Sequence, residues 1–199
     1  MHPAPGFRET GEAALLAHLA AHPFVTLVAA VEARLVVVHA PVVVRQTAGG
    51  VALDFHVSRG NALAAALAGG FRGVAVSLAA EAYVSPDWYA SADQVPTWNY
   101  VSVEAEGPVA VLDEAGLVKL LDDLSAQEEA RLAPKPAWTR GKMSPGRFET
   151  MTRAIVGARM TVERLEGTTK LSQNKDLADR AGVIAALGDH PIARRMREP

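Results

Sequence analysis

Three β-rich runs follow one another closely near the start of the chain, and this spacing constrains the fold more than any other feature. The runs are FVTLVAAV (24–31), RLVVVHAPVVV (34–44) and VALDFHV (51–57), and they are separated by turn-forming EA and QTAGG. Parallel strands need crossover connections of a dozen or more residues. The short connections therefore predict an antiparallel meander.

The rest of the chain alternates further strand-like runs with mostly short helical runs. The predicted strands are 72–84, 99–107, 108–113 and 158–167, with Pro108 as a first-residue or edge proline. The predicted helices are 10–21, 61–68, 114–131, 144–154 and 175–187. This pattern predicts a mainly antiparallel β protein with helices, of the barrel-like α+β class. We expect a single domain over 1–199 that ends in a helical segment.

Composition excludes several classes of protein. The 199 residues are 49% hydrophobic, which is enough to build a core, and the formal net charge of -2 gives no general attraction for nucleic acid. The absence of cysteine excludes disulfides, iron–sulfur clusters and thiolate zinc sites. No export signal and no apolar run of roughly 20 residues is present. We therefore expect a cytoplasmic protein with no membrane partner.

Histidines give no clear metal site. His18 and His22 are four residues apart on the first predicted helix, but they lack an acidic partner, so we expect two solvated surface histidines and no bound metal. The common nucleotide-binding and hydrolase motifs are also absent.

A polar segment follows the third strand. It contains His56, Ser58, Arg59 and Asn61, where Asn61 opens a predicted helix. The arginine fork and the free backbone N–H groups of a helix start suit a phosphate. The same residues also suit an ordinary helix cap beside a surface arginine, and the residues alone leave both interpretations open.

Two other segments concentrate hydrogen-bonding side chains. PTWNY (96–100) starts a strand, and KLSQN (170–174) holds four polar side chains in five residues. Amides and hydroxyls of this kind can read the edge of a planar heterocycle. An Asx-type turn that starts the last helix explains KLSQN equally well.

Taken together, these segments resemble the PaiB-like family of FMN-binding negative transcriptional regulators, which belongs to the flavin-reductase-like split-barrel proteins. The resemblance runs over most of the chain. It is carried by HPFVTLV (22–28), His39-Ala40-Pro41, HVSRGN (56–61), AYVSPDWY (82–89), VPTWNYVSVEAEG (95–107), RAIVGARMTVERLEG (153–167), KLSQNK (170–175) and DRAGVIAAL (179–187).

The resemblance implies a homodimer of split β-barrels with FMN in a cleft between the subunits. Arg59 and Lys170 are then the phosphate partners by charge, and Trp98 is placed to stack on the ring system or wall it off. Asn99, Gln173 and Asn174 suit polar atoms of the isoalloxazine or ribityl group. The full set of implied cofactor contacts is His56, Ser58, Arg59, Asn61, Thr97, Trp98, Asn99, Lys170, Ser172, Gln173 and Asn174.

The function that the family name implies is negative transcriptional regulation. The alternative is an FMN-dependent oxidoreductase or flavin reductase acting on a small molecule, with His39 as the candidate proton donor. A flavin-storing or sensing module without turnover is a third reading, so the sequence leaves enzymatic activity open. The tail HPIARRMREP (190–199) carries several arginines but is typical of a solvated end, so it gives direct DNA binding little support.

Overall fold

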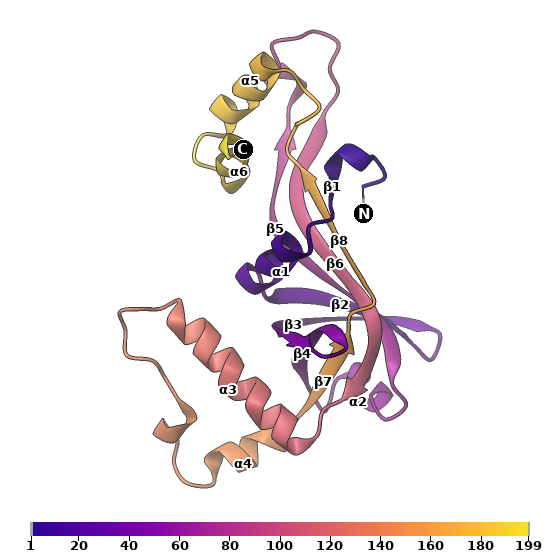
Figure 1. The fold of residues 1–199 in the computed structure, drawn as a ribbon, viewed down its shortest axis with the longest axis vertical. Helices are drawn as coiled ribbons and strands as arrows, with labels where there is room; N and C mark the ends of the chain where they lie inside the picture. The colour runs from indigo at the N-terminus through magenta and orange to yellow at the C-terminus, as the bar shows by residue number, and fades with distance from the viewer. Residues whose placement is uncertain (1, 199) are drawn as a thin grey trace. The chain divides into compact units, whose positions relative to one another are not determined.

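The computed structural model describes residues 2–198 (Figure 1). Eight strands form one antiparallel sheet in the order β1-β8-β6-β5-β2-β3-β4-β7. The described chain divides into two compact units. Unit 1 holds residues 2–18, 77–104 and 165–198, and unit 2 holds residues 19–76 and 105–164. The predicted class, an antiparallel sheet with helices, is confirmed.

Unit 2 is a barrel. Its strands are β2 (Phe24–Val31), β3 (Arg34–Thr47), β4 (Gly50–Ser58), the first part of β5 (Phe71–Val84), the second part of β6 (Thr97–Val111), and β7 (Ile155–Thr161). The barrel closes because β7 pairs with β4 on one side and with β6 on the other. This closure agrees with the expected split barrel.

The barrel core follows the two-residue period of its strands. On β2, Val25, Leu27 and Ala29 are buried, whereas Phe24 is exposed. Helix α3 (Glu114–Ala130) buries Leu120, and the carboxylate of Asp113 caps its first turn by accepting from the Gly116 N–H. Unit 2 also contains α2 (Ala62–Ala66), η3 (Arg140–Lys142) and α4 (Arg147–Thr152).

Unit 1 combines a strand ribbon with small helices. Its elements are η1 (Pro5–Phe7), β1 (Arg8–Glu9), most of α1 (Glu12–Ala21), the remainders of β5 and β6, η2 (Pro86–Trp88), most of β8 (Arg164–Lys170), α5 (Leu177–Leu187) and α6 (Pro191–Arg197). Val84, Val101, Val183, Ile192 and Met196 share one apolar cluster. The two C-terminal helices therefore pack on the end of the β5–β6 ribbon (Figure 1).

The predicted strands 99–107 and 108–113 are one continuous strand, β6. Pro108 lies where β6 changes neighbours, because pairing with β7 starts at Val109. Gly107 permits this exchange: a Cβ there would lie 1.8 Å from the carbonyl oxygen of Thr161. The proline and glycine thus mark a change of partner rather than an end of the strand.

The predicted strand 158–167 is two strands, β7 and β8. Between them, the Val162 N–H donates to Val51 O and the Glu163 N–H donates to Glu106 O, each at 2.9 Å. The chain leaves one neighbour and joins another there, with no glycine or proline to mark the change. The short strand β1, which pairs with Thr168 and Gly167 of β8, was also not predicted.

The C-terminal tail is not a solvated end. Residues 191–197 form helix α6, which buries Ile192, Ala193 and Met196. The predicted helices at 144–154 and 175–187 are present but begin later, at Arg147 and Leu177. No helix within residues 2–198 is long and apolar enough to cross a membrane.

Candidate functional site

Unit 1 contains a polar cavity of about 210 Å³ that gathers five of the predicted contact residues. Segments far apart in the sequence form it: the N-terminal segment, β6, the end of β8 and the loop that follows β8. Its lining residues are His2, Phe7, Val95, Thr97, Asn99, Lys170, Ser172, Asn174 and Lys175.

Strand alternation selects which residues of PTWN face this cavity. Thr97 and Asn99 are two residues apart on β6 and both line it, whereas Trp98 does not. Trp98 is instead half exposed and meets Tyr83 edge-on, with ring centroids 6.0 Å apart. Within unit 1, the predicted contact residue Trp98 therefore lies away from the polar cavity.

Asn99 and Ser172 form a buried polar pair in the cavity wall. Asn99 has no exposed surface and Ser172 is 3% exposed. The Asn99 amide donates to Ser172 Oγ at 2.9 Å, and its nitrogen also lies 3.6 Å from Met196 Sδ. Ser172 has a φ of 54°, in the left-handed region that serine rarely adopts. The loop after β8 is therefore held in an unusual conformation where it meets the cavity.

Lys170 brings a positive charge to the same cavity. Its ammonium donates to Thr97 Oγ1 at 2.6 Å and lies 5.8 Å from the centre of the Phe7 ring. Partial burial lowers the pKa of Lys170, since charging is less favourable away from water. Among residues 2–198 no carboxylate pairs with it. This ammonium is chemically suited to an anionic ligand.

The amide of Gln173 is used within the protein. Its Oε1 accepts from the Leu171 N–H at 2.7 Å, and its Nε2 donates to Gly6 O at 3.1 Å and to Thr169 O. Gln173 lines a second cavity of about 580 Å³ in unit 1 rather than the polar cavity. Its place in KLSQN thus serves to fold the loop and to tie it to the N-terminal segment.

The N-terminal segment supplies two cavity residues that sequence reasoning missed. The rings of His2 and Phe7 meet edge-on at 4.7 Å, and both line the polar cavity. Phe7 follows Pro5, which starts a 3₁₀ turn, but the residues themselves give no signal that this turn reaches β6 and β8. His39, the predicted proton donor, is exposed on unit 2, where Nδ1 contacts Thr26 Oγ1 at 3.2 Å.

The other four predicted contacts lie together in unit 2, at the end of β4 and the start of α2. Asn61 caps α2, accepting from the Leu63 N–H at 2.9 Å, and Ser58 Oγ accepts from Gly60 at 3.3 Å. The Arg59 guanidinium donates to Arg153 O at 2.8 Å and remains exposed. Nδ1 of His56 is buried without a hydrogen-bond partner, and burial lowers the pKa of this imidazole.

Buried charge elsewhere in unit 2 is paired. Asp54, which is 2% exposed, accepts from Arg159 Nε at 2.6 Å and from Arg45 Nε at 2.9 Å. Arg45 also donates to Asp123 of α3. Burial raises the pKa of Asp54, but hydrogen bonds from Arg159 and Arg45 outweigh it, so the pKa lies below the ordinary aspartate value. These ion pairs join β3, β4, β7 and α3.

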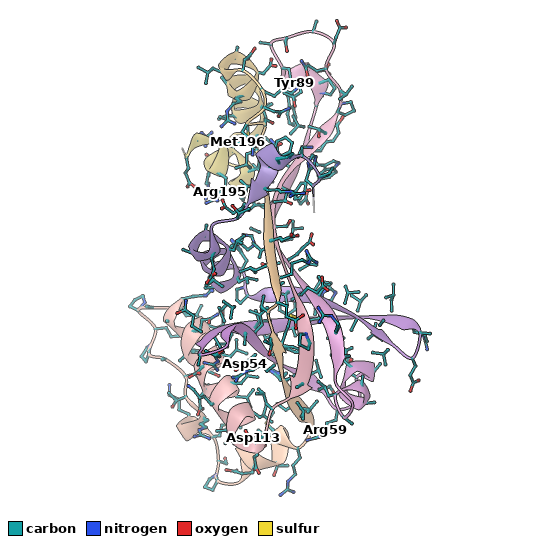
Figure 2. All side chains as sticks on the ribbon, turned by 45° about the vertical axis from the view of Figure 1, so that its right-hand side comes forward. Asp54, Arg59, Tyr89, Asp113, Arg195 and Met196 are labelled. Atoms are coloured by element: carbon teal, nitrogen blue, oxygen red, sulfur yellow. The ribbon has the colours of Figure 1, made fainter. Side chains whose placement is uncertain are left out.

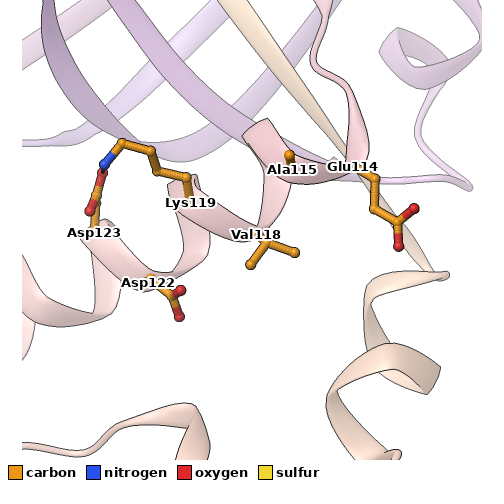
Figure 3. Close-up of a pocket in the computed structure, with 6 residues that line it drawn as sticks. All are labelled: Glu114, Ala115, Val118, Lys119, Asp122 and Asp123. Atoms are coloured by element: carbon orange, nitrogen blue, oxygen red, sulfur yellow. Dashed lines mark hydrogen bonds and ion pairs between the residues drawn. The ribbon is translucent and has the colours of Figure 1, made fainter.

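A wider hollow of about 620 Å³ lies along α3 in unit 2 (Figure 3). It is lined by three carboxylates, those of Glu114, Asp122 and Asp123, against the single ammonium of Lys119. Lys119 is already paired with Asp123 at 2.8 Å. This surface would repel a phosphate, and it holds none of the predicted contact residues.

The antiparallel barrel and the cationic cavity define a split-barrel protein with a site suited to an anionic ligand. The model of the family described as "Putative FMN-binding domain" matches residues 1–164, and the chain belongs to this family. The expected cofactor, FMN, is thereby confirmed at the level of the family.

Individual relatives agree with this assignment. The chain is 34% identical over 119 residues to "Protease synthase and sporulation protein PAI 2" of Bacillus subtilis, which covers 59% of this chain and 56% of that protein. The chain spans about half the length of the curated relatives it matches. The resemblance to the PaiB-like family is confirmed.

Solved structures share the fold at low sequence identity. The FAD and heme binding protein from Mycobacterium smegmatis is 19% identical, with a TM-score of 0.59 over 91% of this chain and 80% of that chain. The flavocytochrome Anf3 from Azotobacter vinelandii is 18% identical, with a TM-score of 0.58 over 91% of this chain and 78% of that chain. These likenesses support the split-barrel fold.

The residues present fit FMN chemically. A phosphate needs cations and hydroxyls, which Lys170 and Thr97 offer in the polar cavity. In unit 2, Arg59 binds Arg153 O through Nε and keeps its two Nη groups for a ligand. The orphaned Nδ1 of His56 is a polar atom without a protein partner, as expected where a ligand completes the hydrogen bonding. When bound, FMN supplies redox chemistry at its ring, and the protein supplies orientation and electrostatics.

Proposed function

We propose that this chain binds FMN with Lys170 and Arg59 as phosphate partners and with the other nine predicted residues around the rest of the cofactor. The observation that carries the proposal is the Lys170 ammonium, which within residues 2–198 meets a hydroxyl and an aromatic ring but no carboxylate, inside a polar cavity. A partly buried cation without a carboxylate costs stability, so a role in binding an anion accounts for it. In this proposal residues 1–199 act as one FMN-binding domain with a C-terminal helical segment.

We also propose a homodimer with FMN at the subunit interface, and two further observations support it. The polar cavity, at about 210 Å³, is smaller than the roughly 300–1,000 Å³ of typical ligand pockets, so FMN needs contacts beyond its lining. In unit 2, Phe24, Leu35 and Val37 expose 69%, 78% and 58% of their surface on adjacent strands. A second copy of the chain that covers this face would bury its apolar side chains, and a homodimer would bring further groups to the cofactor.

The binding proposal is tested by titrating purified protein with FMN and following flavin absorbance and fluorescence. The wild-type chain should bind FMN and turn yellow, whereas the double variant Arg59→Ala, Lys170→Ala should stay folded and colourless. Circular dichroism checks the fold. A double variant that keeps its flavin would show that the phosphate is held elsewhere.

The dimer is tested by sedimentation of Val37→Glu, which places a charge on the exposed apolar face. We expect a monomer with weakened FMN binding. Leu132→Glu is the matched control, since Leu132 is an exposed apolar residue at the end of α3 and outside this face. A dimer that persists in Val37→Glu would place the interface on another surface.

For the biological role, we propose negative regulation of transcription in the cytoplasm. The family resemblance supports it, and the name of the Bacillus relative refers to protease synthesis and sporulation. DNA contact has weaker support, from the exposed Arg194, Arg195 and Arg197 of α6. Selective retardation of promoter DNA that survives physiological salt would support direct repression, whereas binding that disappears with salt would reflect phosphate attraction alone.

A flavin-dependent oxidoreductase is the second candidate, and His2 favours it. His2 is the histidine in the polar cavity, and an imidazole can donate or accept a proton in catalysis. The test is anaerobic addition of NADH or NADPH to the flavin-loaded protein. Bleaching at catalytic rates that falls in His2→Gln would support the enzyme, and no bleaching would favour a regulatory or sensing module.

A further inference from the structure

Arg180, on the first turn of α5, binds main-chain carbonyl oxygens with its guanidinium. Nη1 donates to the carbonyl oxygen of Leu171 at 3.0 Å, and Nη2 donates to the carbonyl oxygen of Met196 at 3.0 Å. Among residues 2–198 no carboxylate pairs with Arg180, so its planar fork joins two stretches of main chain instead. One stretch is the KLSQN loop and the other is helix α6, where Figure 2 labels Met196.

The loop end of this link is the strained part of the cavity wall. Leu171 directly precedes Ser172, whose φ of 54° needs outside support. That support comes from the Arg180 bond to Leu171 O and from the Lys175 N–H, which donates to Ser172 O at 3.0 Å. The Arg180 fork therefore acts next to the residue whose hydroxyl contacts Asn99.

At the other end of the link, Met196 of α6 contacts Asn99, which belongs to the same cavity wall. Met196 is 3% exposed, and its sulfur lies 3.6 Å from the Asn99 amide nitrogen. A thioether accepts hydrogen bonds weakly and donates none, so the NH₂ end of Asn99 must face it. This contact therefore directs the oxygen of the Asn99 amide away from α6.

We propose that Arg180 is a positioning residue for the cofactor site: its fork binds α6 to the KLSQN loop and so holds Ser172 and Asn99 in their binding geometry. Helix α6 is then part of the site, although no α6 residue lines the polar cavity. Both Arg180 and α6 lie beyond residues 1–164, the part matched by the family model. The inference rests on the proposed FMN function.

The experiment compares Arg180→Gln and Arg180→Lys with the control Arg194→Gln, which removes an exposed charge from α6. FMN affinity should fall about tenfold in both Arg180 variants, the factor that the loss of one ordinary hydrogen bond gives. Arg194→Gln should bind as the wild type does. Because lysine keeps the charge but lacks the fork, full recovery of affinity in Arg180→Lys would overturn the positioning role in favour of simple electrostatics.

A second measurement does not depend on FMN. Hydrogen exchange in the apoprotein should quicken at residues 171–175 in both Arg180 variants and stay unchanged in the barrel strands. Unchanged exchange in that loop would overturn the inference even if affinity fell. A wild-type chain that fails to bind FMN would refute the proposed function, whereas the exchange result would still decide whether Arg180 holds the loop.

Met196→Leu separates the sulfur contact from packing, since leucine has a similar volume. We expect a shifted visible spectrum of the bound flavin, with the thermal midpoint kept. An unaltered spectrum and affinity would show that α6 does not orient Asn99.

Discussion

Two charged side chains, Asp54 in unit 2 and Lys170 in unit 1, have opposite surroundings. In the barrel of unit 2, Asp54 receives two arginines and the α3 carboxylate Asp123 shares one of them. In unit 1, the partly buried Lys170 contacts a hydroxyl and an aromatic ring, and no carboxylate of residues 2–198 pairs with it. Removing one partner of a buried ion pair is strongly destabilising, whereas a charge without a partner is itself retained at the expense of stability. The contrast separates a structural ion cluster from a candidate ligand site.

The substitution with the largest expected effect on stability is Asp54→Asn, which leaves Arg45 and Arg159 without their shared carboxylate. We expect a loss of about 3–5 kcal/mol in the free energy of unfolding, the usual effect of breaking a buried ion pair. Chemical denaturation measures it. Asp122→Asn is the control, because its ion pair with Arg140 is exposed and should contribute no more than about 1 kcal/mol. Similar losses in the two variants would contradict the distinction.

Acid should weaken the barrel through the same carboxylate. The pKa of Asp54 in the folded state lies below its unfolded value, so its stabilisation is complete above about pH 4 and is lost as the pH falls through the lowered pKa. We expect the free energy of unfolding of the wild type to fall more steeply with acid than that of Asp54→Asn. Parallel pH profiles would assign acid sensitivity to other groups.

The substitution Lys170→Met tests whether the lysine without a carboxylate partner serves FMN binding rather than stability. FMN affinity should fall by about tenfold to a hundredfold, the range for a hydrogen bond from a charged donor. The thermal midpoint of the apoprotein should be unchanged or higher, because burial disfavours the charged form. Lys142→Met, at an exposed lysine, is the control. A large loss of stability in Lys170→Met would make this lysine structural.

The smallest effects are expected at Asn61, which is both a helix cap and a predicted contact. Asn61→Ala should cost about 1 kcal/mol through the lost cap. Asn61→Asp should keep the cap and the stability but weaken FMN binding, because it adds a negative charge near the proposed phosphate position. Equal FMN affinity in Asn61→Asp and wild type would assign Asn61 to capping alone.

Local rules predicted most elements because propensity and packing agree there. The meander follows from period-two burial and short turns, and Asn61 begins α2 as its side chain requires. Local rules gave wrong element ends where a residue distant in the sequence determines the strand pairing. Gly107 and Pro108 looked like a strand end, but the close carbonyl of Thr161 shows a change of partner.

The sequence allowed us to predict which types of residue form the candidate site, but not how these residues are arranged in space. Thr97 and Asn99 share one face of β6 while Trp98 faces the other, and the strand period alone contained that information. The amide of Gln173 is used by the loop, which no residue pattern reveals. Residues His2 and Phe7, and helix α6 with Met196, reach the site only through tertiary packing.

The period of β6 also limits how the pocket can be redesigned. One residue inserted after Asn99 would turn the preceding part of the strand over relative to Val101 and Val103. The indole of Trp98 would then take the place of the threonine hydroxyl, and the inserted residue would take the place of the asparagine amide. Engineering of ligand preference in this scaffold should therefore exchange side chains and leave strand length alone.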